Sequence, residues 1–271
     1  MLAIKNNIMA ANAARHLGSS YDKLAQSVER LSSGLRINGA KDDAAGLAVR
    51  ELMRADIAVL EQGARNANDG ISMLQTFEGE MGTIDEALVR MKQLAEQAAT
   101  GSYSSEQRTI MNNEFSEMAA EINRIAGATA FNGNTLLNSA SASISIQFGA
   151  ADTDVVEVSG CDVTSSALSL SSASISTVSA AQSALATVAA AITTKDTARA
   201  AFGYKMNRLE STISVINNQT ENLMAAESRI SDVDVATEMA AMTRTQVLAQ
   251  AGVSMLAQAN TVPQMALSLL R

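Results

Sequence analysis

Apolar residues recur at coiled-coil spacing at both ends of the chain, and this pattern constrains the fold more than any other feature. Steps of three and four residues separate them within residues 1–36 and again within 235–271. A helix with this heptad pattern needs a partner helix to cover its apolar stripe. We therefore predict that the terminal helices pair with each other and then with neighbouring copies of the chain, which indicates assembly rather than a binding pocket.

The predicted stripes can be read position by position. They are Ala10, Ala14, Leu17, Tyr21, Leu24, Val28 and Leu31 at the start and Leu248, Ala251, Met255, Gln258, Val262, Met265 and Leu269 at the end. We predict that a subset of these positions, with Leu35, forms the terminal coiled coil and the subunit interface. That subset is Leu24, Val28, Leu31, Leu35, Leu248, Met255, Val262, Met265 and Leu269.

The composition favours long helices over a compact globule. Aromatic residues make up only 3% of the chain, Trp is absent and there is a single Pro, whereas Met occurs 14 times. The net charge of −8 argues against nucleic acid as a partner, because phosphates require a basic surface. The sequence has no run of about 18 apolar residues, so no transmembrane helix is predicted. No secretory signal peptide is recognisable at the N-terminus.

The sequence offers no candidate for catalysis or metal binding. Cys161 is the only cysteine, which excludes an intrachain disulfide, and His16 is the only histidine, which leaves a zinc site or a Ser-His-Asp triad poorly supported. Asp42 and Asp43 stand where a helix is expected to begin, and capping explains them. We predict that the protein is not an enzyme and needs no cofactor.

Three further helices are predicted between the ends. One runs from about residue 42 to 100, and a Gly/Ser turn joins it to a second that runs to about 127, with Ser104 or Ser105 as the cap. The third runs from about 180 to 230, and residues 231–234 break it before the terminal helix. The predicted domains are a terminal coiled coil (1–40 with 232–271) and a helical rod (41–231).

Residues 130–178 differ from the rest of the chain. A turn at residues 131–134 precedes an alternating run, Ser143–Phe148, and a second short run, Val155–Val158, which together predict a small β-hairpin. The Ser-rich stretch that follows is expected to be exposed. The predicted fold is therefore mainly α, a long coiled-coil bundle with paired terminal helices and a β-hairpin at its distal tip.

Several motifs in the same order resemble those of bacterial flagellin. They are residues 28–38 (VERLSSGLRIN), 40–46 (AKDDAAG), 65–72 (RNANDGIS), 131–133 (FNG), 256–260 (LAQAN), 262–264 (VPQ) and 267–271 (LSLLR). The resemblance covers about residues 1–138 and 195–271. The segment between them is short, as in a flagellin without large outer domains.

This resemblance implies a structural subunit of the flagellar filament, located outside the cell and used for motility. It implies type III export in an unfolded state, without a cleaved signal peptide, and polymerisation into a hollow tube whose channel the terminal helices line. The implied partners are further copies of the chain, the export apparatus and its chaperone, and the cap and junction proteins. Neither nucleic acid nor a membrane is expected as a partner.

Two surface sites are also implied. In flagellins that the vertebrate flagellin-sensing toll-like receptor detects, an Arg and a Leu on the long N-side helix and a Glu on the next helix carry recognition. Arg90, Leu94 and Glu114 match them, although Gln93 stands where an acidic residue is common. O-linked sugars, which some flagellins carry, would suit the Ser-rich stretch at Ser165, Ser166, Ser169, Ser171 and Ser172.

Other functions remain open at this stage. A hook–filament junction protein resembles flagellin mainly at its ends, whereas the resemblance here continues through residues 65–72 and 131–133. A secreted coiled-coil adaptor would show the same heptads, and an enzyme is the weakest alternative because no nucleophile and base can be named.

Overall fold

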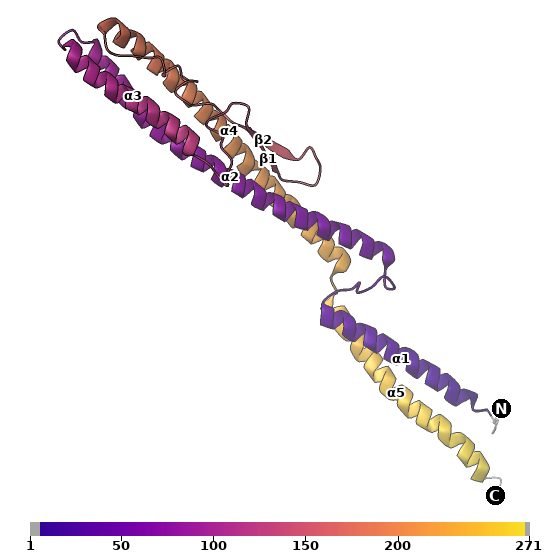
Figure 1. Ribbon diagram of the computed structural model, residues 1–271. Helices are drawn as coiled ribbons and strands as arrows, with labels where there is room; N and C mark the ends of the chain where they lie inside the picture. Colours follow the sequence, from indigo (N-terminus) through magenta and orange to yellow (C-terminus); the bar gives the residue numbers. More distant parts are fainter. Residues whose placement is uncertain (1–5, 269–271) are drawn as a thin grey trace. The chain divides into compact units, whose positions relative to one another are not determined.

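The computed structural model describes residues 6–268, with side-chain environments up to residue 262, and is mainly helical (Figure 1). Its elements are α1 (Ile8–Ser33), α2 (Ala44–Ala99), α3 (Ser105–Ala128), β1 (Ser143–Gln147), β2 (Val155–Ser159), α4 (Val178–Ser231) and α5 (Val235–Ser268). The predicted fold class is confirmed. The chain forms two compact units, residues 1–55 with 222–271 and residues 56–221.

In the first unit, α1 and α5 form an antiparallel pair (Figure 1). Near the end of α1, Arg30 lies 3.7 Å from the Glu238 carboxylate at the beginning of α5. At the other end, the side-chain amide of Asn7 donates to the Ala259 carbonyl oxygen at 2.8 Å. The two terminal segments therefore pair with each other, as the heptads predict.

The face of α1 that contacts α5 is not quite the predicted stripe. At every second position of the stripe, the residue one place earlier in the sequence is the more covered one. Tyr21 and Val28 are about half exposed, at 51% and 50%, whereas Ser20 and Ser27 on the neighbouring face are more covered. Short side chains let the helices approach closely, since a Cβ on Gly252 of α5 would lie 3.1 Å from the Leu17 side chain. Apolar spacing alone locates a stripe but does not fix which of its edges makes the contact.

Local capping explains where the helices of this unit begin. The Asp43 carboxylate accepts a hydrogen bond from the Gly46 amide at 2.9 Å and caps α2, while Asp42 accepts from the Asn38 and Gly39 amides at 3.2 Å each. Asp234 accepts from the Ala236 amide at 3.0 Å and caps α5. The predicted helix breaks near residues 40 and 232 are thus confirmed.

The second unit packs α2, α3 and α4 around one core. Phe77, Leu88, Phe115 and Ile122 have no more than 1% of their surface exposed, and the Phe77 and Phe202 rings lie 6.4 Å apart between centroids. Ser104 caps α3 in a capping box with Gln107, as predicted for this turn.

The hairpin pairs Ile144 with Val158 and Ile146 with Val156. Its predicted position at the distal tip is wrong, because it lies part-way along the helices, away from the turn between α2 and α3 (Figure 1), and contacts α2. The hairpin approaches α2 at Gly63, where an added Cβ atom would overlap the Phe148 carbonyl oxygen. The turn from α2 to α3 begins only about 36 residues after Gly63. Glycine permits this approach of strand to helix.

The Ser-rich stretch is not a simple exposed linker. Val163, Leu168, Leu170 and Ile175 are all at most 4% exposed and belong to the core of the second unit. Their irregular spacing matches neither the helical nor the strand period, so the pattern could not reveal their burial.

Candidate functional site

The first unit exposes apolar side chains on the faces of α1 and α5 that do not contact each other. The terminal apolar stripe, as we name this set, comprises Ile8, Met9, Tyr21, Val28, Val235, Met239, Val247, Leu248, Val253 and Met255, each at least 45% exposed. Single exposed apolar residues are ordinary, but a set this large on one pair of helices makes the pair the candidate site of the first unit.

The predicted interface residues fall into three groups. Leu24, Leu31, Leu35 and Val262 are half-buried, and Leu24 and Leu31 lie on the α5-facing side of α1. Val28, Leu248 and Met255 are 50% to 63% exposed and belong to the terminal apolar stripe, so they do not form the contact between α1 and α5. The Met265 side chain and Leu269 lie outside the described residues.

The residues implied in receptor recognition are only partly at the surface. The Arg90 guanidinium donates to one Glu114 carboxylate oxygen through two nitrogens, at 2.8 and 2.6 Å, and joins α2 to α3. Leu94, however, is only 2% exposed, and its expected role as a surface anchor is wrong. It is buried because α2 is covered on more than one side. Val89, next to Arg90, is 44% exposed and rims a shallow depression with Lys92.

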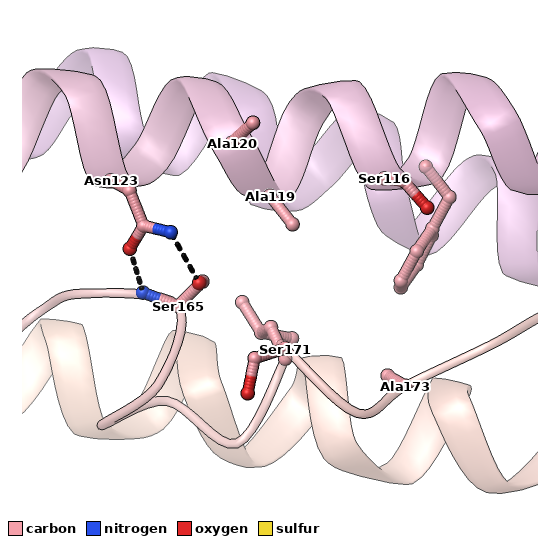
Figure 2. A pocket seen from close by; sticks show the side chains of 9 residues that line it. Ser116, Ala119, Ala120, Asn123, Ser165, Ser171 and Ala173 are labelled. Carbon is pink, nitrogen blue, oxygen red and sulfur yellow. Dashed lines mark hydrogen bonds between the residues drawn. The ribbon is translucent and has the colours of Figure 1, made fainter.

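A cavity of about 230 Å³ lies between α3 and the Ser-rich stretch (Figure 2). At one end Asn123 is doubly bonded to Ser165, donating to its hydroxyl at 2.7 Å and accepting from its amide at 2.8 Å. At the other end Asn112 accepts from the Ile175 amide at 2.8 Å. Neutral residues line the cavity throughout, so it offers room for a small neutral group but no acid, base or ion pair.

The candidate modification sites are not equivalent. Ser165 is 3% exposed and its hydroxyl already accepts a hydrogen bond, so its assignment as a surface glycosylation site is wrong. Ser166, Ser169, Ser171 and Ser172 are exposed.

Titratable chemistry is sparse in the described part of the chain. Burial raises the pKa of the Cys161 thiol to about 11, with a smaller contribution from the Asp162 charge, so the thiol stays protonated and weakly nucleophilic at neutral pH. Within residues 6–268, no three His, Cys, Asp or Glu side chains lie as a metal site would need. No described helix is long and apolar enough to cross a membrane.

Two cations of α4 that pair with carboxylates of α2 were missed in the sequence, and one of them is buried. Lys195 is 1% exposed, and its ammonium lies 2.5 Å from Asp85 and 2.7 Å from Asp196. One turn further along α4, Arg199 lies 2.8 Å from the Glu78 carboxylate of α2. The only available signal was that both cations occupy positions of the apolar repeat of α4.

Two family models match most of the chain. The bacterial flagellin N-terminal helical region matches residues 4–142, and the bacterial flagellin C-terminal helical region matches residues 185–270. The chain is 42% identical over 272 residues to a flagellin of Halalkalibacterium halodurans and 37% identical over 304 residues to a flagellin of Bacillus subtilis, with complete coverage of both partners in each case. It is also 40% identical to the flagellar filament 33 kDa core protein of Treponema phagedenis, again over full lengths.

Solved structures show the same fold. Bacillus cereus flagellin superimposes with a TM-score of 0.52 at 30% identity, covering 60% of this chain and 94% of that one. A flagellar hook-associated protein of Vibrio parahaemolyticus shares the fold, with a TM-score of 0.59 at 14% identity, over 70% of this chain and 100% of that one. The full-length relatives decide between the two kinds of protein: the chain belongs to the bacterial flagellin family and is a structural subunit of the flagellar filament.

Proposed function

We propose that neighbouring subunits of the filament contact one another through the terminal apolar stripe. The observation that carries this proposal is the exposure of Val28 on α1 and of Leu248 and Met255, which are seven residues apart on α5. The described residues of their own chain leave at least half of each of these apolar side chains uncovered. Covering apolar surface contributes about 25 cal/mol per Å², and a polymer repeats this gain at every subunit.

Seeded polymerisation tests the interface. Leu248→Asp should raise the critical concentration at least tenfold, because it would place a charge inside an apolar contact. Gln250→Asp is the matched control, since Gln250 is exposed on the same helix but is polar. Equal critical concentrations for both variants would contradict the proposed interface, and a circular dichroism spectrum would show that both keep their helices.

The cellular route is proposed from family membership. As a filament subunit the protein lies outside the cell, and we infer that the flagellar export apparatus, with its chaperone, carries it there unfolded and without a cleaved signal peptide. The cap and junction proteins would then meet it at the growing end. A strain without the export gate should retain the protein in the cytoplasm, and its presence in the medium of that strain would exclude this route.

Receptor recognition is proposed for the paired Arg90 and Glu114 with the exposed Val89 beside them. Arg90→Ala in the monomer should lower the response of cells that carry the flagellin-sensing receptor. Arg124→Ala is the control, because Arg124 is also an exposed Arg paired with a carboxylate, that of Glu121 on α3. An Arg90→Ala response equal to that of the wild type would reject the assignment.

Sugar attachment is proposed only for the exposed Ser166, Ser169, Ser171 and Ser172. The intact mass of native protein tests it, since a mass equal to that of the sequence leaves no room for a sugar. An epitope in place of these residues would show independently whether antibody reaches them in the filament.

A further inference from the structure

Lys195 is an unusual residue for the core of a helix pair. It occupies a position of the apolar repeat on α4, its side chain is 1% exposed, and its ammonium is bonded to Asp85 of α2 and Asp196 of its own helix. Only the ammonium is buried, since the Asp85 and Asp196 side chains are 38% and 59% exposed. Such a pair adds little net stability, because removing the ammonium from water offsets its attraction to the carboxylates. The best attested use of a polar residue in a coiled-coil contact is to fix the register.

On one side of Lys195, the apolar part of the contact leaves the register open. Ala181, Ala184, Val188 and Ala191 supply the buried face of α4 before Lys195. Small and similar side chains at heptad spacing pack almost equally well after a shift of seven residues. Beyond Lys195 the buried Phe202 packs against Phe77 of α2 and favours one alignment, but nothing apolar does so along the stretch of small residues. A polar feature beside that stretch can therefore help to select the alignment of α2 and α4.

Two ion pairs together select one alignment. Lys195 pairs with Asp85 and Arg199 pairs with Glu78, and the two carboxylates stand seven residues apart on α2. A shift of one heptad in one direction would move Lys195 beside Glu78 and Arg199 beside the apolar Ile71. The opposite shift would move Arg199 beside Asp85 and Lys195 beside Lys92. Each shift thus keeps one pair and leaves the other cation unpaired or repelled.

We propose that Lys195 and Arg199 are positioning residues that fix the register of α2 against α4. Every copy in a helical polymer must present the same surface to its neighbours, so a copy shifted by one heptad would not fit the growing end. The function that this register serves is assembly of identical subunits, and the proposal does not depend on the terminal apolar stripe.

The register can be measured with spin labels. Cysteines at the exposed Thr76 of α2 and Ala186 of α4, in a Cys161→Ser background, carry the labels. A shift of one heptad changes their separation along the axis by about 10 Å. The parent protein should show one distance.

The two variants should shift in opposite directions. Lys195→Met removes the repulsion with Lys92, so a population of about 10% or more should appear at the longer distance. Arg199→Gln removes the cation that would meet Ile71, so the new population should appear at the shorter distance. Lys195→Arg, which keeps the charge, should restore the single distance.

Stability and assembly complete the test. Lys195→Met should unfold at the same temperature as the parent or higher, yet polymerise to at most half the parent yield in seeded assays. Arg208→Met is the control, because it removes an exposed positive charge from the same helix.

Should Lys195→Met not fold, Arg199→Gln alone decides, since the pair of Arg199 with Glu78 is partly exposed. A single parental distance in both variants, or a loss of folding in both, would overturn the proposal.

Discussion

At the scale of single residues, two glycines on α2 determine where the hairpin can lie. A Cβ on Gly63 would overlap the Phe148 backbone, and one on Gly70 would overlap the Ile146 side chain. Gly79 on the same helix has no atom within 4 Å of such a Cβ. The same substitution therefore has opposite expected effects at positions only a few turns apart.

Gly63→Ala should destabilise the second unit by about 1–3 kcal/mol, because backbone cannot yield as a flexible side chain can. Gly79→Ala should stabilise it by about 0.5–1 kcal/mol through the helix propensity of Ala. Urea unfolding midpoints measure both. Equal shifts of the same sign would show that the hairpin does not lie on α2 as described.

Asp42 gives the first unit a pH-dependent contact. Hydrogen bonds from the Asn38 amide, and then from Gln26 and the Gly39 amide, hold the pKa of its carboxyl below the usual 3.8. A depressed pKa means that its stabilisation is fully present above pH 3.8 and is lost as the pH falls through the folded value. Asp42→Ala should therefore melt below the wild type at pH 7, and the difference should shrink under acid. Asp69→Ala, at an exposed carboxylate of α2, is the control.

At the scale of elements, two asparagines of α3 hold the Ser-rich stretch in place. Asn123 binds Ser165 at one end of the cavity, and Asn112 binds the Ile175 amide at the other (Figure 2 shows the first). The stretch has no regular structure of its own, so these bonds and its buried side chains position it.

Asn123→Ala should loosen this stretch without unfolding the bundle. Leaving the Ser165 groups unpaired costs about 1–3 kcal/mol, which corresponds to amide exchange that is roughly 5- to 150-fold faster at residues 164–170. Asn113→Ala provides the control at a neighbouring exposed asparagine. Unchanged exchange in Asn123→Ala would mean that the apolar side chains alone hold the stretch.

At the scale of the whole molecule, we expect the two ends of the chain to be the least stable part of the monomer. Ala, Ser and Gly supply much of the contact between α1 and α5, and the terminal apolar stripe stays exposed. Amides of residues 1–36 and 235–271 should therefore exchange fast in the monomer and slowly in the filament. Deleting residues 262–271 should abolish polymerisation while the second unit keeps its helices. Equal protection in both states would refute this view.

Local signals in the sequence predicted the elements well. Ser104 and Asp234 cap helices where polar residues interrupt the apolar repeat, and the hairpin pairs the two short runs that predicted it. Contacts between distant segments were harder to predict. Val28 and Leu94 have the spacing of their neighbours, yet one is exposed and the other buried, because partner helices decide which face is covered.

The segment that links α1 to α2 and the segment that links α4 to α5 lie side by side. The Arg36 amide donates to the Ser231 carbonyl oxygen at 2.6 Å, and the Val233 amide donates to the Gly34 carbonyl oxygen at 3.0 Å. Tension applied to the terminal helices of an assembled subunit is therefore shared by these two linking segments. Because the two segments are also hydrogen-bonded to each other, a load on one is passed in part to the other, and the pair resists extension more than a single segment would.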